Sequence, residues 1–200
     1  LVWRSALGAN VLDVDGNRFL DFTSGFGAAS IGHRHPRIVA AVTRQAEELL
    51  HGLGDVAAHP ARIELAGRLC ALAPVDDPRV HFAVSGADAV EIAWKTALLA
   101  TGKRRLLAFE PGYHGLTFGA LAATSRREFR APFAAQLSPH AARLPFACDL
   151  EQVAQVLSPG NDVAAVLVEP IVGREGVLVP PAGWLAGLAR LCRENGALLV

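Results

Sequence analysis

Apolar and polar residues follow two different patterns along the chain, and the pattern changes near residue 79. Residues 11–22 alternate around Asp15-Gly16, which predicts a β-hairpin. After Pro36 and again after Pro60, apolar residues recur every three to four positions, so we expect two helices, the second ending near Leu72. This first part of the chain therefore predicts a small hairpin followed by two helices.

From residue 79 onward the pattern predicts strands that alternate with helices. Residues 79–84 and 105–109 are predicted strands, and residues 87–100 between them are a predicted helix that Thr101-Gly102 ends. A strand, a helix and a strand within about 30 residues form a βαβ unit, which requires a parallel sheet. The sequence thus predicts an α/β fold.

The rest of the chain continues this alternation. Residues 162–170 are a continuously apolar stretch typical of a strand buried on both faces, and residues 183–200 predict a helix, a stop at Asn195-Gly196 and a final strand. Residues 126–160 are less regular, and only a short helix near residues 150–157 is predicted there.

Composition excludes several classes of protein. Lys and Arg together number 19, as do Asp and Glu, so no net field attracts nucleic acid or an anionic membrane. No apolar run approaches the roughly 20 residues that span a bilayer, and we expect a cytoplasmic protein. The three cysteines are widely spaced and His33 and His35 lack a third ligand, so we expect reduced thiols and no metal site.

The two ends of the sequence indicate a piece of a longer protein. Methionine is absent, so residue 1 is not an ordinary translation start. The last four residues, Ala-Leu-Leu-Val, end inside a predicted buried strand. We therefore expect further chain after Val200.

Residues suited to chemistry follow the predicted strands. Ser85-Gly86-Ala87 follows the first, Gly112-Tyr113-His114-Gly115 the second, and Glu169-Pro170 ends the third. Ligands of open parallel sheets gather outside the carboxyl ends of the strands, and a helix N-terminus preceded by small residues suits an anion. These positions together predict a ligand with a phosphate and a flat ring, such as a nucleotide or a pyridine cofactor.

Each signal also has a purely structural interpretation. Ser85 with Asp88 three residues later matches a capping box, which needs no ligand. Tyr113-His114 is compatible with an ordinary loop closed by aromatic packing, and Glu169 with a solvated strand end. The residues alone leave both interpretations open.

Six motifs in order resemble the class III aminotransferases, pyridoxal-phosphate enzymes of fold type I that include ornithine, acetylornithine and 4-aminobutyrate aminotransferases. The resemblance covers nearly the whole chain, as its N-terminal portion, and is carried by "VLDVDGNRFLDF", "GHRHP", "SGADAVEIAWK", "YHGLT", "VEPIVGREGV" and "CRENGALLV". It implies an amino-group transfer from an amino acid or an ω-amino or diamino donor to a 2-oxo acid. The open alternative is a non-catalytic module that kept the fold for binding or assembly.

The resemblance also implies roles for particular residues. Residues expected to bind pyridoxal phosphate, with the first three at its phosphate and Tyr113 stacked on its ring, are Ser85, Gly86, Ala87, Tyr113 and His114. Residues expected near the substrate are Glu169 and Phe26. A homodimer is implied, in which residues 1–55 belong to a smaller α+β domain and residues 56–200 to the large cofactor-binding domain with its mostly parallel sheet.

The sequence departs from the family pattern at several positions. Asp88 stands where glutamate is common, Val172 where many members carry glutamine, and Glu175 where glycine is usual. The family's aspartate at the pyridine nitrogen and its Schiff-base lysine are both expected after Val200. No catalytic residue is therefore expected in this chain, whose two lysines, Lys95 and Lys103, are predicted to lie away from the site.

Overall fold

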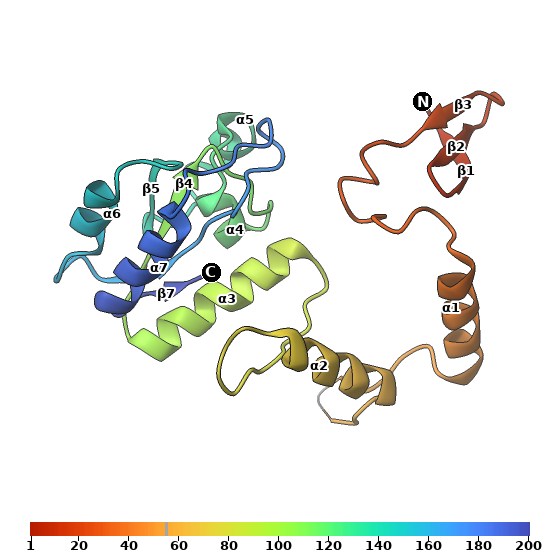
Figure 1. Ribbon diagram of the computed structural model, residues 1–200, viewed down its shortest axis with the longest axis horizontal. Helices are drawn as coiled ribbons and strands as arrows, with labels where there is room; N and C mark the ends of the chain where they lie inside the picture. The colour runs from red at the N-terminus through yellow and green to blue at the C-terminus, as the bar shows by residue number, and fades with distance from the viewer. Residues whose placement is uncertain (55) are drawn as a thin grey trace. The chain divides into compact units, whose positions relative to one another are not determined.

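The computed structural model, drawn in Figure 1, describes residues 1–54 and 56–200. The contacts within the chain divide it into two units, residues 1–80 and 81–200. Each unit has its own β-sheet. The predicted division into domains at residues 1–55 and 56–200 refers to the whole protein and stays a prediction.

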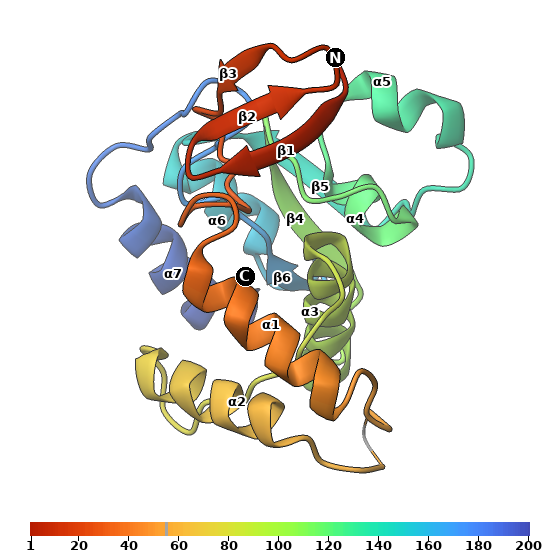
Figure 2. The same cartoon turned by 90° about the vertical axis from the view of Figure 1, so that its right-hand side faces the viewer.

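The sheet of the first unit is antiparallel and has the order β1-β2-β3, with β1 Trp3–Leu7, β2 Asn10–Asp13 and β3 Arg18–Leu20 (Figure 2). The predicted hairpin is β2-β3 and is confirmed. Its turn forms because the Asp13 carboxylate accepts the backbone N–H groups of Asp15 at 3.0 Å and Asn17 at 2.8 Å. Strand β1 was not predicted, because its largely exposed residues lack the alternation of a half-buried strand.

Both predicted helices of the first unit are confirmed as α1, Pro36–Glu48, and α2, Pro60–Leu72. Each begins at its proline, whose fixed φ suits the first helical position and whose missing N–H would have no acceptor there. Neither helix buries a residue in this structure.

The second unit is built on a parallel sheet of order β5-β4-β6-β7. The strands are β4 Arg105–Glu110, β5 Ala141–Pro145, β6 Val163–Val166 and β7 Leu198–Leu199. The prediction of an α/β class with a parallel sheet is confirmed.

Helices cover both faces of this sheet. Leu107 and Phe109 of β4 pack with α6, Leu150–Leu157, and α7, Trp184–Glu194, in one apolar cluster. Leu106 and Ala108 pack in a second cluster with α3, Gly86–Thr101, and α4, Phe118–Ala123. Successive β4 residues point to opposite faces, so one apolar run supplies both cores. The short helix α5, Arg127–Arg130, and a 3-10 turn at Ala131–Phe133 follow α4 (Figure 1).

The prediction of a strand over residues 79–84 is wrong, since the described part of the chain has no strand there. A strand exists only where a neighbour completes its hydrogen-bond ladder, and an apolar pattern alone does not supply that neighbour. The helix that follows forms nonetheless, and Gly102 ends it with a left-handed φ of 69°.

Two other expectations need adjustment in the second unit. The apolar stretch of residues 162–170 forms only the four-residue strand β6. Residues 126–160 contain β5 in addition to the predicted short helix, which α6 confirms. β5 was missed because its sequence, Ala-Ala-Arg-Leu-Pro, is neither β-branched nor alternating.

The cysteines are free thiols, as expected. Burial raises the pKa of Cys192 to about 11, which leaves its thiol protonated and unreactive. Within the described residues, the helices are all too short or too polar to cross a bilayer, and no group of three or more metal-ligating side chains comes together.

Replacing a fully buried side chain of α7 tests this two-sided core. Leu188 has no exposed surface, so Leu188→Ala is expected to lower the free energy of unfolding by about 2–5 kcal/mol through lost burial and a cavity. Arg190→Ala on the exposed side of the same helix is the control, with an expected change within about 0.5 kcal/mol. Urea unfolding followed by circular dichroism measures both; equal effects would contradict the packing.

Candidate functional site

The three segments that carry the predicted site residues of the second unit lie together, although the strand predicted before Ser85 does not form. Ser85, Gly86 and Ala87 line one open depression together with Tyr113 and His114. Glu169 lies next to them, because its carboxylate accepts the backbone N–H of Tyr113 at 2.8 Å. Residues from three separate parts of the sequence therefore share one edge of the sheet.

The N-terminus of α3 forms one wall of the depression. Ser85 is the N-cap, and its Oγ accepts the Asp88 N–H at 3.1 Å, while the Asp88 carboxylate accepts the Val84 N–H at 3.0 Å. Helix geometry leaves the N–H groups of Gly86 and Ala87 without acceptors inside the helix. The capping interpretation of Ser85 is thus correct, and it is compatible with an anion at the next two residues.

Gly115 allows the aromatic loop to reach this helix. Its φ is +127°, and a Cβ at this position would lie 2.5 Å from the Cβ of Ala87. Any other residue would therefore push the loop away from α3. The contact places a helix N-terminus beside the Tyr113 side chain, which is the arrangement that a phosphate attached to a flat ring requires.

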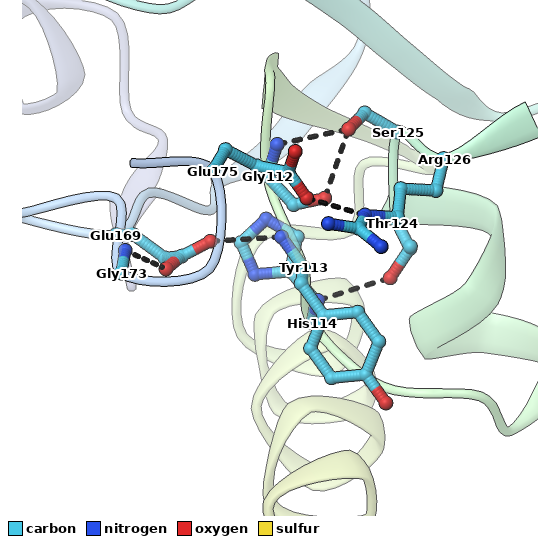
Figure 3. Close-up of polar contacts among 9 residues, drawn as sticks. All are labelled: Gly112, Tyr113, His114, Thr124, Ser125, Arg126, Glu169, Gly173 and Glu175. Carbon is cyan, nitrogen blue, oxygen red and sulfur yellow. Dashed lines mark hydrogen bonds and ion pairs between the residues drawn. The ribbon is translucent and has the colours of Figure 1, made fainter. Parts of the chain in front are cut away.

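Two hydroxyl groups after α4 hold the other side of the loop (Figure 3). Thr124 Oγ1 accepts the His114 N–H at 2.9 Å, and Ser125 Oγ accepts the Gly112 N–H at 2.9 Å. Thr124 is completely buried. Sequence analysis missed this pair, although two hydroxyl residues directly after a small-residue helix are a usable signal for loop hydrogen bonds.

Glu169 acts in the structure as a bridge between two loops. One oxygen accepts the Tyr113 N–H, and the other accepts the Gly173 N–H at 3.1 Å (Figure 3). Glu169 is therefore not a freely solvated residue at a strand end. A carboxylate has about four acceptor positions, so these two bonds leave capacity for a ligand, and the substrate role of Glu169 stays a prediction.

The ring of Tyr113 has contacts that the sequence did not reveal. The Arg174 guanidinium lies over it, with Cζ 4.3 Å from the ring centroid, and the Phe129 ring meets it edge-on at 6.1 Å. Arg126, three residues before Phe129, forms an ion pair with Glu175. The partners of such pairs are far apart in sequence, so no local pattern reveals them.

Glu91 is another residue that sequence analysis missed. Its carboxylate accepts the Thr117 hydroxyl at 2.6 Å and the backbone N–H groups of Gly119 and Ala120 at 2.8 and 3.1 Å. A side chain of α3 thereby caps α4 and fixes the direction in which the chain leaves the aromatic loop.

The His114 side chain is half-buried and carries a shifted pKa. Burial lowers the pKa of His114 below the ordinary value of 6.5, and the nearby Glu169 carboxylate opposes this shift. The neutral imidazole is therefore favoured at neutral pH.

The two lysines lie away from this edge. Lys95 is on the exposed side of α3. Lys103 Nζ donates to the backbone carbonyls of Asn195 at 2.6 Å and Gly196 at 2.8 Å, beyond the far end of α3. A helix of 16 residues spans roughly 24 Å, so Lys103 cannot reach the depression at Gly86.

Phe26 belongs to the first unit, in a loop organised by Asp21. The Asp21 carboxylate accepts the N–H groups of Thr23 at 3.0 Å and Gly25 at 3.2 Å and pairs with His33 Nε2 at 2.8 Å. The His33 interaction, foremost, lowers the pKa of Asp21. His33 thus pairs with a carboxylate of its own loop. The substrate role of Phe26 stays a prediction.

The fold and these motifs define a family. The chain belongs to the class-III aminotransferases, whose family model matches residues 1–200. It is 41% identical over 193 residues to acetylornithine aminotransferase of Methanopyrus kandleri, covering 96% of this chain and 48% of that protein. It is 38% identical over 204 residues to putrescine aminotransferase of Pectobacterium atrosepticum, covering 99% and 43%. The chain thus spans about half the length of the curated relatives it matches.

Solved structures agree with this assignment. Ornithine aminotransferase of Toxoplasma gondii superposes with a TM-score of 0.89 at 30% identity, covering all of this chain and 48% of that one. Taurine:2-oxoglutarate aminotransferase of Bifidobacterium kashiwanohense, solved with PLP and glutamate, has the same score and identity, covering 99% and 49%. The expected fold of a pyridoxal-phosphate-dependent transferase, present as its N-terminal portion, is confirmed.

The lowered pKa of His114 predicts a pH dependence of stability. As the pH falls through 6.5, the unfolded chain takes up a proton that the folded chain does not, so stability decreases. His114→Gln is expected to reduce this decrease. Urea titrations at several pH values between 7.5 and about 5 measure the slopes; parallel slopes for the parent and His114→Gln would contradict the assignment.

Proposed function

We propose that this chain is the cofactor-phosphate and ring-binding portion of an aminotransferase that moves an amino group from an amino acid, or an ω-amino or diamino donor, to a 2-oxo acid. The observation that carries the proposal is the depression in which the N-terminus of α3 meets Tyr113 and His114. Membership of the class-III family supports pyridoxal phosphate as the cofactor. Relatives named as acetylornithine and putrescine aminotransferases support ω-amino and diamino donors.

The residues present fit this cofactor. The N–H groups of Gly86 and Ala87, with the Ser85 hydroxyl beside them, would bind the phosphate, since a helix N-terminus favours an anion. The Tyr113 ring would pack on the pyridine ring, with the neutral His114 next to it in the same loop. Glu169 would contact the substrate. A substrate role is proposed for Phe26 as well, from the family resemblance alone.

Pyridoxal phosphate, when bound, supplies an electron sink for reactions at the α-carbon of the amino donor. The residues of this chain hold and orient it. The base and the aspartate at the pyridine nitrogen are proposed to lie after Val200. We further propose that the whole protein is cytoplasmic and that residues 1–55 belong to its small domain and residues 56–200 to its large domain.

The position of the reactive amine tests the function itself. The full-length protein, incubated with pyridoxal phosphate and reduced with borohydride, should carry one pyridoxyl label on a lysine after Val200 and should convert an ω-amino donor. The 200-residue chain should give no stoichiometric label, because Lys103 is held at the opposite end of α3 and Lys95 faces solvent. Peptide mapping locates the label.

Two results of that mapping would count against the proposal. Stoichiometric label on Lys95 or Lys103 would contradict the site assignment. Full-length protein that binds the cofactor without any transamination would favour the non-catalytic module.

The proposed stacking predicts a graded response at Tyr113. In the full-length protein Tyr113→Ala should weaken cofactor retention by roughly 0.5–1.5 kcal/mol, about two- to twelvefold, because the aromatic contact is lost. Tyr113→Phe keeps the ring and should retain the cofactor almost as the parent does. Absorbance of the protein after dialysis measures retention, and equal retention by the alanine variant would exclude stacking.

A homodimer is proposed for the full-length protein, since the family resemblance implies sites formed between subunits. The exposed apolar residues of the first-unit helices, such as Val42 at 64% and Ile63 at 60%, are consistent with surfaces that further protein covers. Light scattering of the full-length protein should give twice the mass of one chain; an active monomer would contradict this.

A further inference from the structure

The loop Gly112–Gly115 is held by two segments that are remote in sequence. On one side, Thr124 and Ser125 bind its backbone through their hydroxyl groups. On the other side, Glu169 accepts the Tyr113 N–H, and Arg174 lies over the Tyr113 ring. Neither segment is a neighbour of the loop along the chain, so the position of Tyr113 depends on how both segments are placed.

A single ion pair joins these two segments directly. Arg126 follows Ser125 in the first segment, and Glu175 follows Arg174 in the second; Arg126 Nε donates to Glu175 Oε1. The two side chains are 36% and 20% exposed. Solvent therefore reaches this pair less than the pairs Arg68–Glu64, Arg79–Asp77 and Arg190–Glu194, in which both side chains are more exposed. Figure 3 shows Arg126 and Glu175 meeting on the side of the loop where Ser125 binds Gly112.

We propose that the Arg126–Glu175 ion pair closes a clamp around the loop Gly112–Gly115 and thereby positions the Tyr113 ring for the cofactor. The clamp is a closed circuit of contacts: from Arg126 to Glu175, along the chain to Arg174, onto the Tyr113 ring, and back through Gly112 to Ser125. Arg126 and Glu175 are positioning residues, since they act on the cofactor through Tyr113. The role of the clamp in cofactor binding rests on the proposed function, whereas the existence of the clamp does not.

A further contact of Arg126 favours a positioning role over an incidental surface pair. Arg126 also lies over the Phe129 ring, 6.0 Å from its centroid, and Phe129 meets Tyr113 edge-on. The Arg126 side chain is therefore linked to Tyr113 through two sets of contacts, one through Phe129 and one through Glu175 and Arg174.

Removal of the Glu175 charge should loosen the loop without unfolding the sheet. In the full-length enzyme, Glu175→Gln is expected to raise the rate of pyridoxal phosphate dissociation about three- to tenfold, the size expected when contacting charged residues are uncoupled. In the cofactor-free enzyme, the amide hydrogens of residues 112–115 should exchange faster, because the loop opens more often. The urea midpoint should stay that of the parent.

Matched variants separate the ion pair from a general loss of charge. Glu194→Gln breaks the exposed Arg190–Glu194 pair of α7 and should alter neither dissociation nor exchange at residues 112–115. Arg126→Gln combined with Glu175→Gln should be no worse than either change alone. The charge swap Arg126→Glu with Glu175→Arg should restore a large part of both properties.

Each outcome decides the inference. Unchanged exchange at residues 112–115 in Glu175→Gln, or additive effects in the double variant, would overturn the clamp. Faster exchange with an unchanged dissociation rate would overturn the positioning role. If the parent enzyme binds no pyridoxal phosphate, the proposed function fails, while the exchange measurement still decides whether the clamp exists.

Discussion

The parallel pairing of β4 with β5 on one side and β6 on the other is the constraint on which the candidate site depends. Parallel strands end at the same edge of the sheet, so the segments that follow them gather there even when, as for Tyr113 and Glu169, 56 residues separate them in sequence. β4 can take this central place because its residues supply an apolar contact to both layers of helices in turn. The aromatic loop and Glu169 are neighbours for this reason.

At that edge of the sheet the backbone no longer forms hydrogen bonds with a neighbouring strand, and side chains accept its N–H groups instead. Thr124, Ser125 and Glu169 accept backbone N–H groups of the aromatic loop, and Glu91 does the same for the start of α4. A loop held in this way is more precisely placed than one that only water solvates, since each buried polar group costs free energy when it is left unpaired. The glycine at 115 then permits contact with α3.

In the proposed reaction, the groups at this edge of the sheet bind and orient the cofactor. The two lysines are on the exposed face and at the far end of α3, so the reactive amine is not among these groups. The family model matches residues 1–200, and the chain covers about half the length of the curated relatives.

Local sequence determined the elements whose signals are local. The hairpin at Asp15-Gly16, the proline starts of α1 and α2, the end of α3 at Gly102 and the short helix α6 all follow from the conformational limits of single residues and from apolar periodicity.

The strand predicted at residues 79–84 was wrong, and β5 was missed, because a strand is completed by a partner that no local pattern specifies. The position of Tyr113 could be predicted from the rule for strand ends, because it follows β4. Ser85, Gly86 and Ala87 follow no strand in the described residues, and the start of α3 places them. Only the tertiary structure decided that Arg174 covers Tyr113 and that Arg126 pairs with Glu175. The partners of each pair are far apart in sequence, and only the fold brings them within contact distance.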